Sequence, residues 1–462
     1  MAGPSPAKLA LARAVGSLSR LRGGGATSAP GRVLMRLAPD SLRELGARLD
    51  RGSILISATN GKTTTAAMTA SILEHAGISA VHNQAGANMA GGIATTLLGA
   101  ARRGGGIDGE LGLFEVDEMW LAGVASQLQP RAILLSNLFR DQLDRYGELE
   151  TIADSWERTT RSSAAELVLN ADDPLVADLG REREHVLYFG VNDSSLALAG
   201  MAHAADAKHC RRCGAPYVFD EVYLGHLGHY HCSSCGRTRP APEIIASEIE
   251  LEGVRAASMT LSTPEGSMRV RIAVPGLYNL YNALAAAALA TALGVPLETV
   301  AAGLTATRAA FGRAETVSLA VAGGEHREMR IMLVKNPAGA NEVLRTLALE
   351  PGEHHVLAVL NDQIADGRDV SWIWDADFEL LTGRIRSVTC SGSRAADLAT
   401  RLKYAGVDTA AIHVQENLVG ALDTAAGSVS SGGTLYALPT YTAMLALRDL
   451  LVARGEAPSA WS

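Results

Sequence analysis

Residues 53–65 read SILISATNGKTTT, an apolar strand that runs through a loop of small residues into a helix-forming segment. Backbone N–H groups in such a loop, together with the N-terminus of the helix behind it, attract phosphate. A lysine at the start of the helix can reach the outer phosphates of a nucleotide, and the hydroxyl that follows it can bind Mg²⁺. The stretch therefore predicts a nucleoside triphosphate site, with Lys62 and Thr63 as its first candidate residues.

The loop departs from the standard pattern G-x-x-x-x-G-K-[ST], because Ile56 stands five residues before Gly61, where that pattern has a glycine. The alternative is an ordinary strand–turn–helix connection with a lysine on the surface. Composition favours the phosphate loop, since only five of the 41 Lys and Arg residues are lysine. Where arginine is the usual cation, a lysine in this loop indicates a specific role.

The composition narrows the class of protein. A length of 462 residues predicts two or three domains, and 47% hydrophobic with 5% aromatic residues suits layered α/β folds. The net charge of −8 gives no general attraction to nucleic acid or to an anionic membrane. No apolar run reaches the length of a membrane span, and five Cys do not form a disulfide framework, so we expect a cytoplasmic protein.

Basic residues interrupt the apolar positions of residues 1–31, so this segment is not a secretory signal. It could be a surface helix that touches a membrane, but we expect a helix packed on the first domain.

A repeated strand–loop–helix order predicts a parallel sheet covered on both faces. The third strand of this series, residues 111–118, ends in carboxylates that favour a Mg²⁺ site. Asp117 or Glu118 could instead cap the following helix, whereas Glu115 lies inside the strand run. The expected strands are 53–57, 78–82, 111–118, 132–138, 166–170, 185–190, 248–261, 267–274, 356–360, 387–390 and 434–437, and the expected helices are 40–49, 64–76, 93–99, 283–293, 395–404 and 442–451.

Two C-x-x-C pairs, Cys210 with Cys213 and Cys232 with Cys235, are separated by eighteen residues, which is typical of a zinc ribbon. Four thiolates close a tetrahedral site, so the expected zinc is structural. Two redox dithiols or a pair of disulfides are the alternatives. Nearby histidines could supply a substitute ligand, namely His203, His209, His226, His229 and His231.

Two further segments carry polar groups in places that favour ligands. Asn279 and Asn282 lie three residues apart at a helix start, so they share one face, although Asn279 could simply be the N-cap. Residues 361–375 combine acidic and amide side chains with two tryptophans, which indicates a binding surface or an active-site loop.

Taken together, these motifs resemble the Mur ligase family, whose members use ATP to convert a carboxylate into an acyl phosphate that an amine then attacks. The resemblance rests on the loop 59–64, the strand-end Glu115, and residues 170–174, 278–282 and 312–315. It implies that Lys62 and Glu115 act in catalysis and that Thr63 and Glu115 hold Mg²⁺. It also implies that ATP is bound by Thr59, Asn60, Gly61, Lys62, Thr63, Thr64, Asn279, Asn282 and Arg313.

The sequence departs from that family at several positions. Ala58 stands where a glycine is usual, Tyr278 replaces a histidine, and Gln142 replaces the histidine of an Asp-His pair. No lysine occurs between Lys62 and Lys208, which excludes the family's carbamylated lysine from this part of the chain.

Within the family the chain resembles the MurT group, the ligase-like subunits of lipid II isoglutaminyl synthase, through the cysteine insertion and residues 331–341 and 361–375. This implies amidation of the D-glutamate α-carboxylate of the lipid II stem peptide to D-isoglutamine. Four of the five cysteines are assigned to zinc, and Cys390 lacks a glycine-flanked nucleophile turn, so ammonia should come from a separate glutaminase of GatD type. We expect Asp369, with Asp366 and Asp375 as alternatives, to complete that partner's Cys–His pair as the third member of a triad.

The expected fold is therefore an α/β protein with a Mur ligase-like P-loop domain, a zinc-ribbon insertion and a C-terminal α/β domain. The expected boundaries are 1–50 for an N-terminal helical segment, 51–315 for the ATP-binding domain with its insertion at 201–240, and 316–462 for the domain that contacts the glutaminase. The expected location is cytoplasmic, with a peripheral position at the inner face of the membrane as an open alternative. A self-contained amino-acid ligase is the alternative, and a nucleic-acid-binding protein is disfavoured because basic residues do not cluster beyond Arg211 and Arg212.

Overall fold

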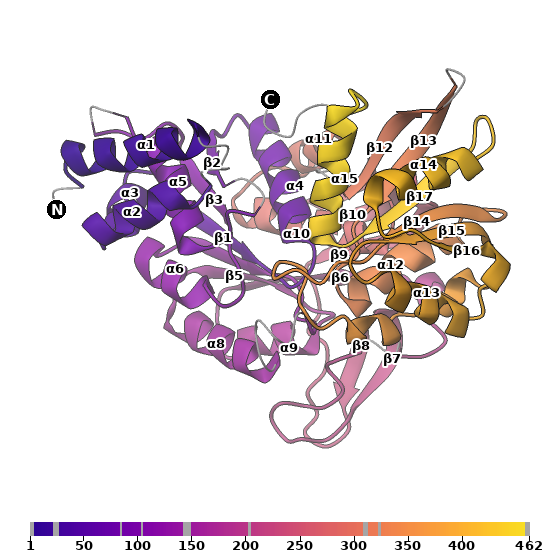
Figure 1. The fold of residues 1–462 in the computed structure, drawn as a ribbon. Helices are drawn as coiled ribbons and strands as arrows, with labels where there is room; N and C mark the ends of the chain where they lie inside the picture. Colours follow the sequence, from indigo (N-terminus) through magenta and orange to yellow (C-terminus); the bar gives the residue numbers. More distant parts are fainter. Residues whose placement is uncertain are drawn as a thin grey trace.

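The fold contains two sheets that lie side by side, each between layers of helices (Figure 1). A small hairpin projects below them in this view. The computed structural model describes residues 4–21, 27–83, 86–102, 105–141, 149–201, 205–307, 313–321 and 325–457, and of residues 18–21, 313 and 314 it describes the backbone alone.

The first sheet contains nine strands among the described residues, in the order β11-β10-β9-β6-β5-β4-β1-β3-β2. Strands β1 to β6 and β9 pair in parallel. Strands β1, β3 and β4 are buried along their whole length, which explains why their sequences show no alternation of polar and apolar residues. The strands are β1 (Ser53–Ser57), β2 (Ala80–His82), β3 (Leu111–Glu115), β4 (Ala132–Leu135), β5 (Glu166–Asn170), β6 (Val186–Val191), β9 (Ile244–Glu252), β10 (Ala256–Thr263) and β11 (Gly266–Ile272).

One edge of this sheet differs from the prediction. The single strand expected over residues 248–261 is wrong, because β9 and β10 form an antiparallel hairpin that turns at Gly253, whose φ is +57°. Strand β11 then pairs antiparallel with β10, so the sheet is mixed rather than purely parallel. The turn was missed because the residues on both sides of Gly253 are equally compatible with one long strand.

Helices cover both faces of the first sheet. On one face pack α4 (Lys62–His75), α10 (Leu277–Ala292) and α11 (Leu297–Ala306), and the alanines 283 and 285–288 of α10 are completely buried, which lets this helix lie close to the strands. On the other face lie α1 (Pro6–Leu21), α2 (Ala29–Leu37), α3 (Ser41–Gly46), α5 (Ala90–Ala100), α6 (Leu121–Leu128), α8 (Leu149–Ser162) and α9 (Pro174–Ala177). Leu9 and Ala12 of α1 belong to that core, which confirms the expectation of a packed N-terminal helix.

The second sheet has six strands in the part of the chain that the structure describes, in the order β12-β13-β17-β14-β15-β16. They are β12 (Arg313–Ala320), β13 (His326–Met332), β14 (His354–Val359), β15 (Ile385–Ser391), β16 (Ile412–Val414) and β17 (Thr434–Pro439). Its helices are α12 (Pro337–Ala348), α13 (Ala395–Tyr404), α14 (Leu418–Ser428) and α15 (Tyr441–Ala453). Of these strands and helices, β12, β13, β16, α12 and α14 were not predicted.

The remaining elements are short. Strands β7 (Tyr217–Leu224) and β8 (Leu227–Cys232) form a separate antiparallel hairpin. The 3₁₀ helices are η1 (Asp178–Gly180), η2 (Ser194–Leu196), η3 (Ser371–Trp374), η4 (Phe378–Leu381) and η5 (Thr409–Ala411). Among the helices described, none has both the length and the apolar character needed to cross a membrane.

Replacing Asp172 by alanine is expected to lower the free energy of unfolding by about 3–5 kcal/mol, because the change leaves the Arg239 guanidinium without its buried partner. The fully buried Asp172 carboxylate accepts from Arg239 Nε at 2.5 Å, from the Tyr281 hydroxyl at 2.7 Å and from the Val191 N–H at 2.8 Å. Urea denaturation measures the change.

The exposed pair of Asp108 with Arg102 supplies the control for this measurement. Asp108→Ala should cost less than about 1 kcal/mol. Equal effects of the two substitutions would contradict the importance of the buried pair.

Candidate active site and metal centre

The phosphate loop joins the end of β1 to the start of α4, and α10 closes over it. Gly61 has a φ of +87°, and a Cβ added to it would lie 1.9 Å from Asn282 Oδ1. Glycine is therefore required here both by the left-handed backbone and by the close approach of α10.

Lys62, the first residue of α4, is buried and directed into the loop. Its Nζ donates to Glu118 Oε2 at 2.7 Å and to the carbonyl of Ala58. Burial by itself would lower the pKa of the Lys62 ammonium, but the carboxylates of Glu118, Glu115 and Asp117 together outweigh burial, and the pKa is raised above its ordinary value. Lys62 is thus a fixed positive charge behind the loop, as phosphate binding requires.

Thr63 and Glu115 lie together, as the sequence predicted for a Mg²⁺ site. The Thr63 hydroxyl donates to Glu115 Oε2 at 2.8 Å, and Asn88 Nδ2 lies 3.4 Å from Glu115 Oε1. Asn83 holds the backbone of Glu115 through two bonds of 2.9 Å. A hydroxyl and a carboxylate at the end of a strand are the oxygen donors that Mg²⁺ prefers, so these residues fit the ion.

Asp117 and Glu118 do not both act as helix caps. Trp120 is the N-cap of α6, Asp117 Oδ1 accepts from the N–H of Met119 at 3.2 Å, and Glu118 pairs with Lys62. The alternative of a cap is therefore wrong for Glu118.

The far side of the loop is held by residues that sequence reasoning did not assign to the site. Asn137 follows β4 and exchanges two hydrogen bonds with the backbone of Asn60, at 2.9 and 3.0 Å. Lys335 reaches over from the second sheet to the carbonyl of Thr59 at 3.0 Å and to Asp141 Oδ2 at 2.7 Å. A polar residue at the end of a parallel strand was the available signal for Asn137.

The neighbouring Asn336 contributes to the same contact, because its Nδ2 donates to Asn60 Oδ1 at 3.0 Å. Thr59 itself is held by its hydroxyl, which accepts from the N–H of Phe139 at 3.0 Å. The loop is thus fixed from both sheets, and the second sheet contributes a second cation beside it.

The other predicted nucleotide residues take different positions. Asn279 is not the N-cap of α10, since that position belongs to Gly276. Its Nδ2 donates to the carbonyl of Pro275 at 2.7 Å and its Oδ1 accepts from Asn282, which in turn accepts from Thr65 at 3.3 Å. Thr64 is buried on α4. Arg313 is the first residue of β12, but its side chain lies outside the described residues, and Gln142 lies outside them entirely.

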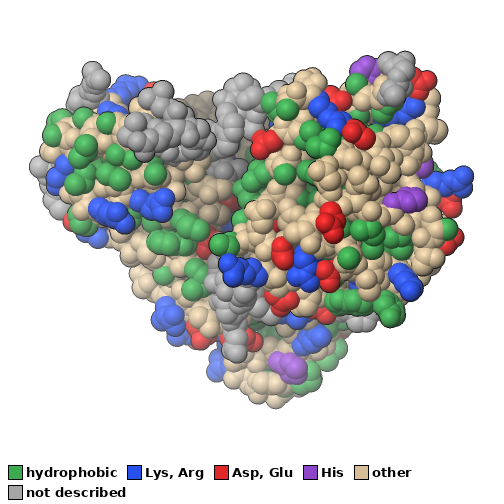
Figure 2. Space-filling view, viewed as in Figure 1, with side chains coloured by type: hydrophobic (Ala, Val, Ile, Leu, Met, Phe, Trp, Pro, Cys, Tyr) green, Lys and Arg blue, Asp and Glu red, His purple; other side chains and the backbone are tan. Residues whose placement is uncertain are grey.

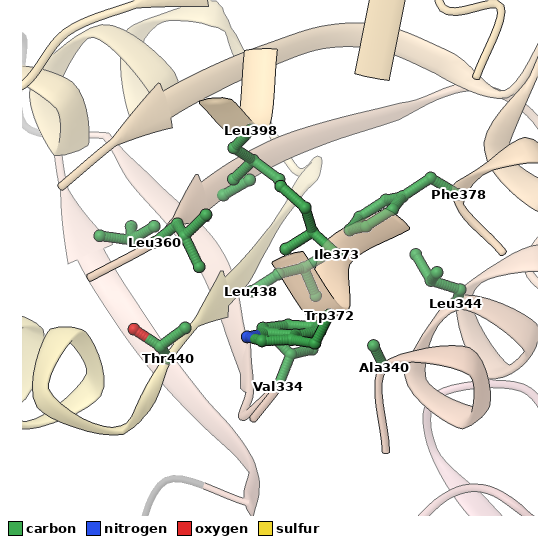
Figure 3. Close-up of a pocket in the computed structure, with 12 residues that line it drawn as sticks. Val334, Ala340, Leu344, Leu360, Trp372, Ile373, Phe378, Leu398, Leu438 and Thr440 are labelled. Atoms are coloured by element: carbon green, nitrogen blue, oxygen red, sulfur yellow. The ribbon is translucent and has the colours of Figure 1, made fainter. Parts of the chain in front are cut away.

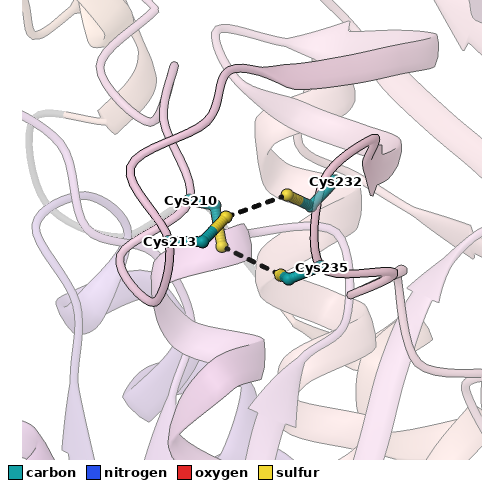
Figure 4. A group of neighbouring side chains, drawn as sticks. All are labelled: Cys210, Cys213, Cys232 and Cys235. Atoms are coloured by element: carbon teal, nitrogen blue, oxygen red, sulfur yellow. Dashed lines mark hydrogen bonds between the residues drawn. The ribbon is translucent and has the colours of Figure 1, made fainter.

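The four cysteines of the insertion come together at the base of the β7–β8 hairpin (Figure 4). Their sulfur atoms all lie within 4.8 Å of one another, with Cys210 Sγ 3.7 Å from Cys235 Sγ and Cys213 Sγ 3.5 Å from Cys232 Sγ. Ligands at Zn–S distances of about 2.3 Å are roughly 3.8 Å apart in a tetrahedron, so the cluster fits zinc. The histidines described near it are not part of this group.

Replacing Cys232 by serine is expected to abolish stoichiometric zinc binding and to lower the free energy of unfolding by about 4 kcal/mol when free zinc is a thousandfold above its Kd. Zinc content after dialysis and a denaturation curve measure the two effects. Ser233→Ala, between the two cysteines of the same knuckle, is the matched control. Unchanged zinc content in Cys232→Ser would contradict the four-cysteine site.

Asp369 lies on the segment between β14 and η3, which an apolar cluster fastens to the second sheet. Trp372, Ile373 and Phe378 line a small cavity together with Leu360 and residues of α12 and α13 (Figure 3). Asp369 itself is exposed and accepts from the N–H of Ser371 at 2.8 Å, which lowers the pKa of its carboxyl.

The two alternatives to Asp369 already have partners in the structure. Asp366 is buried and accepts from the N–H of Thr442 at 2.7 Å, at the start of α15. Asp375 lies 3.7 Å from Arg140.

Comparison with known proteins identifies the family. The model of the Mur ligase middle domain matches residues 56–219, and the model of the MurT ligase C-terminal domain matches residues 333–444. The chain is 34% identical over 441 residues to the subunit MurT of lipid II isoglutaminyl synthase (glutamine-hydrolyzing) from Streptococcus pneumoniae, which covers 95% of this chain and 94% of that protein. The chain belongs to the MurT family.

A second MurT subunit, from Staphylococcus aureus, is 32% identical over 442 residues and covers 96% of both chains. Membership of the MurT family makes the chain an ATP-dependent ligase related to peptidoglycan synthesis, and Mur ligases use ATP and Mg²⁺.

Solved structures agree with the fold of this MurT-family chain. A pseudomurein peptide ligase type C from Methanothermus fervidus superposes with a TM-score of 0.68 at 22% identity, over 88% of this chain and 79% of that one. MurF from Acinetobacter baumannii gives a TM-score of 0.66 at 20% identity, over 92% and 80%. MurF from Thermotoga maritima, solved in complex with ADP, gives 0.62 at 15% identity, over 92% and 85%.

Proposed function

We propose that this chain amidates the α-carboxylate of D-glutamate in the stem peptide of lipid II, giving D-isoglutamine, with ammonia from a separate glutaminase subunit. The observation that carries the proposal is the 34% identity, along nearly the whole chain, to a subunit named for this synthase. The geometry supports it, because Lys62, bonded to Glu118, and Thr63, bonded to Glu115, lie where β1 and β3 end, as a phosphoryl-transfer site requires.

The chemistry has two steps. A carboxylate oxygen of the substrate attacks the γ-phosphorus of ATP and ADP leaves; ammonia then attacks the acyl carbon, phosphate leaves, and the amine loses a proton. Lys62 and the loop N–H groups stabilise the negative charge that spreads over the transferring phosphoryl group. Thr63 and Glu115 would hold Mg²⁺, which would supply further positive charge. Lys335 places a second ammonium 3.0 Å from the carbonyl of Thr59, beside the phosphate loop.

The cysteines support a separate source of ammonia. Glutamine hydrolysis requires a reactive thiolate. Four cysteines form the metal cluster, and Cys390 is buried in β15, where burial raises the pKa of its thiol to about 12. A glutaminase subunit of GatD type would provide both the nucleophile and its histidine.

Asp369 is the residue that we propose to complete the partner's triad. It is exposed and free to face another chain, whereas Asp366 is buried against α15 and Asp375 lies beside Arg140. The bond from the Ser371 N–H holds the Asp369 carboxylate in its ionised form, which is the form that orients a histidine.

Reconstitution tests the proposal. The purified chain, a glutaminase subunit, ATP, Mg²⁺, glutamine and lipid II should yield D-isoglutamine by mass spectrometry, with equal amounts of ADP released. Omission of the glutaminase should stop the reaction with glutamine but not with ammonium. Product formed from a free amino acid without the glutaminase would instead support a self-contained amino-acid ligase and overturn the proposal.

A further inference from the structure

The helices α1, α2 and α3, together called the N-terminal cap, differ in charge from the rest of the molecule. Residues 1–51 contain nine Lys and Arg against three Asp and Glu, a net charge of +6, while the remaining residues carry 32 basic and 46 acidic side chains, a net charge of −14. The overall charge of −8 therefore conceals a strong asymmetry between one end of the chain and everything else.

The exposed surface of the cap is both basic and apolar. Lys8, Arg32 and Arg36 are exposed and make no ion pair with any described residue, whereas Leu11 and Leu37 beside them are 53% and 37% exposed. Figure 2 shows Lys, Arg and hydrophobic side chains gathered over the lobe that carries α1–α3, with few acidic ones. Helices that lie at a membrane surface combine basic and apolar side chains in this way.

The cap is fastened along the length of α5. Arg13 on α1 donates to the carbonyls of Leu98, at 3.1 Å, and Ala101 at the C-terminal end of α5. Gly31 on α2 packs against the N-terminal end, where its N–H donates to Thr95 Oγ1 at 2.9 Å and an added Cβ would lie 1.9 Å from the carbonyl oxygen of Gly91. The cap therefore has one fixed orientation relative to the sheet.

This orientation brings the cap to the edge of the catalytic site. Helix α5 begins directly after Asn88 and Met89, and Asn88 contacts both Glu115 and the N–H of Asp117. Met89, Met119 and Trp120 extend the exposed apolar surface there, each about two-fifths exposed. An apolar surface thus continues from the basic cap to the neighbourhood of Glu115, one of the proposed Mg²⁺ ligands.

We propose that the N-terminal cap docks on an anionic phospholipid bilayer and presents the phosphate loop to a substrate whose lipid anchor stays in that bilayer. The inference rests on the proposed function for its substrate. The acidic remainder of the chain is repelled by the same surface, so the charge asymmetry also sets the orientation of docking. Because the contact combines Coulomb attraction with a few exposed apolar side chains, the binding is reversible and weakens as salt is added.

Vesicle sedimentation tests the docking with the complete ligase–glutaminase complex. Vesicles of phosphatidylglycerol and phosphatidylcholine should retain the complex at low salt and release it at high salt, and pure phosphatidylcholine should not retain it. The double variant Arg32→Glu/Arg36→Glu should lower the partition coefficient at least about tenfold. Arg255→Glu/Arg386→Glu, at two exposed arginines elsewhere, is the matched control and should bind like the wild type.

Activity separates this inference from the proposed function. The Arg32→Glu/Arg36→Glu variant should amidate a detergent-dispersed substrate at the wild-type rate but lose activity on the same substrate embedded in anionic vesicles, with unchanged thermal unfolding. Wild-type retention of the variant on anionic vesicles, or equal binding of the wild type to neutral ones, overturns the docking. Absence of amidation in detergent by the wild type overturns the proposed function instead.

Discussion

Replacing Lys62 by alanine is expected to reduce ATP-dependent amidation by about 10²–10³-fold, with glutamine or with ammonium as the nitrogen source. The Lys62 ammonium is the charge at the base of the phosphate loop, and removal of one preorganised group of this kind costs about 10²–10³ in kcat. Release of ADP coupled to product measures the effect.

Loss of Lys62 also leaves the Glu118 carboxylate buried without its partner, so destabilisation must be separated from lost catalysis. Lys62→Met keeps most of the buried stem, and the double variant Lys62→Met/Glu118→Gln removes the unpaired charge as well. We expect the double variant to regain stability in urea denaturation but not activity. Recovery of activity with stability would contradict a catalytic role for Lys62.

Replacing Asp369 by asparagine is expected to reduce glutamine-driven amidation by about 10³–10⁴, the effect of removing the carboxylate from a comparable triad. Amidation from added ammonium should stay within about twofold of the wild type, because Asp369 lies on the exposed segment before η3 and none of its described contacts reaches the phosphate loop. Parallel assays with the two nitrogen sources on the assembled complex provide the measurement.

Two neighbouring residues serve as comparisons for Asp369. Asp375→Asn should retain glutamine use, and Asp366→Asn should lower stability first, since Asp366 holds the start of α15. Wild-type glutamine use by Asp369→Asn would show that our assignment of the triad residue is wrong.

Patterns within short segments account for the features that could be predicted. The phosphate loop lies within thirteen consecutive residues, and its strand, glycine and lysine each follow from local backbone and charge requirements. The two cysteine pairs predicted a cluster because each pair needs only one turn of chain to bring its sulfurs together. The strands of the parallel core could also be predicted from local pattern, because each is a continuous apolar run between turns.

Contacts between distant segments account for what could not be predicted. In the sequence, nothing distinguishes Glu118 from the other acidic residues after β3, and only the structure shows that it pairs with Lys62. In the same way, only the structure shows that Asn137, a polar residue after β4, bonds the backbone of Asn60. Lys335 lies 276 residues beyond Thr59, and no periodicity in the sequence connects them. The hairpin of β9 and β10 was missed because pairing partners, rather than local propensity, decide where a long strand-like run turns.

The amino-acid sequence by itself thus predicted the chemistry: a loop suited to phosphate, a hydroxyl and a carboxylate suited to Mg²⁺, and four thiols suited to zinc, and it determined the family to which the chain belongs. Only the tertiary structure decided how these groups are held, with the second sheet and α10 both closing on the loop of the first sheet and the basic cap directed to the edge of the site. The physical reason is that covalent neighbours set local conformation and charge, whereas burial and hydrogen bonding are shared among residues that only the packed fold brings into contact.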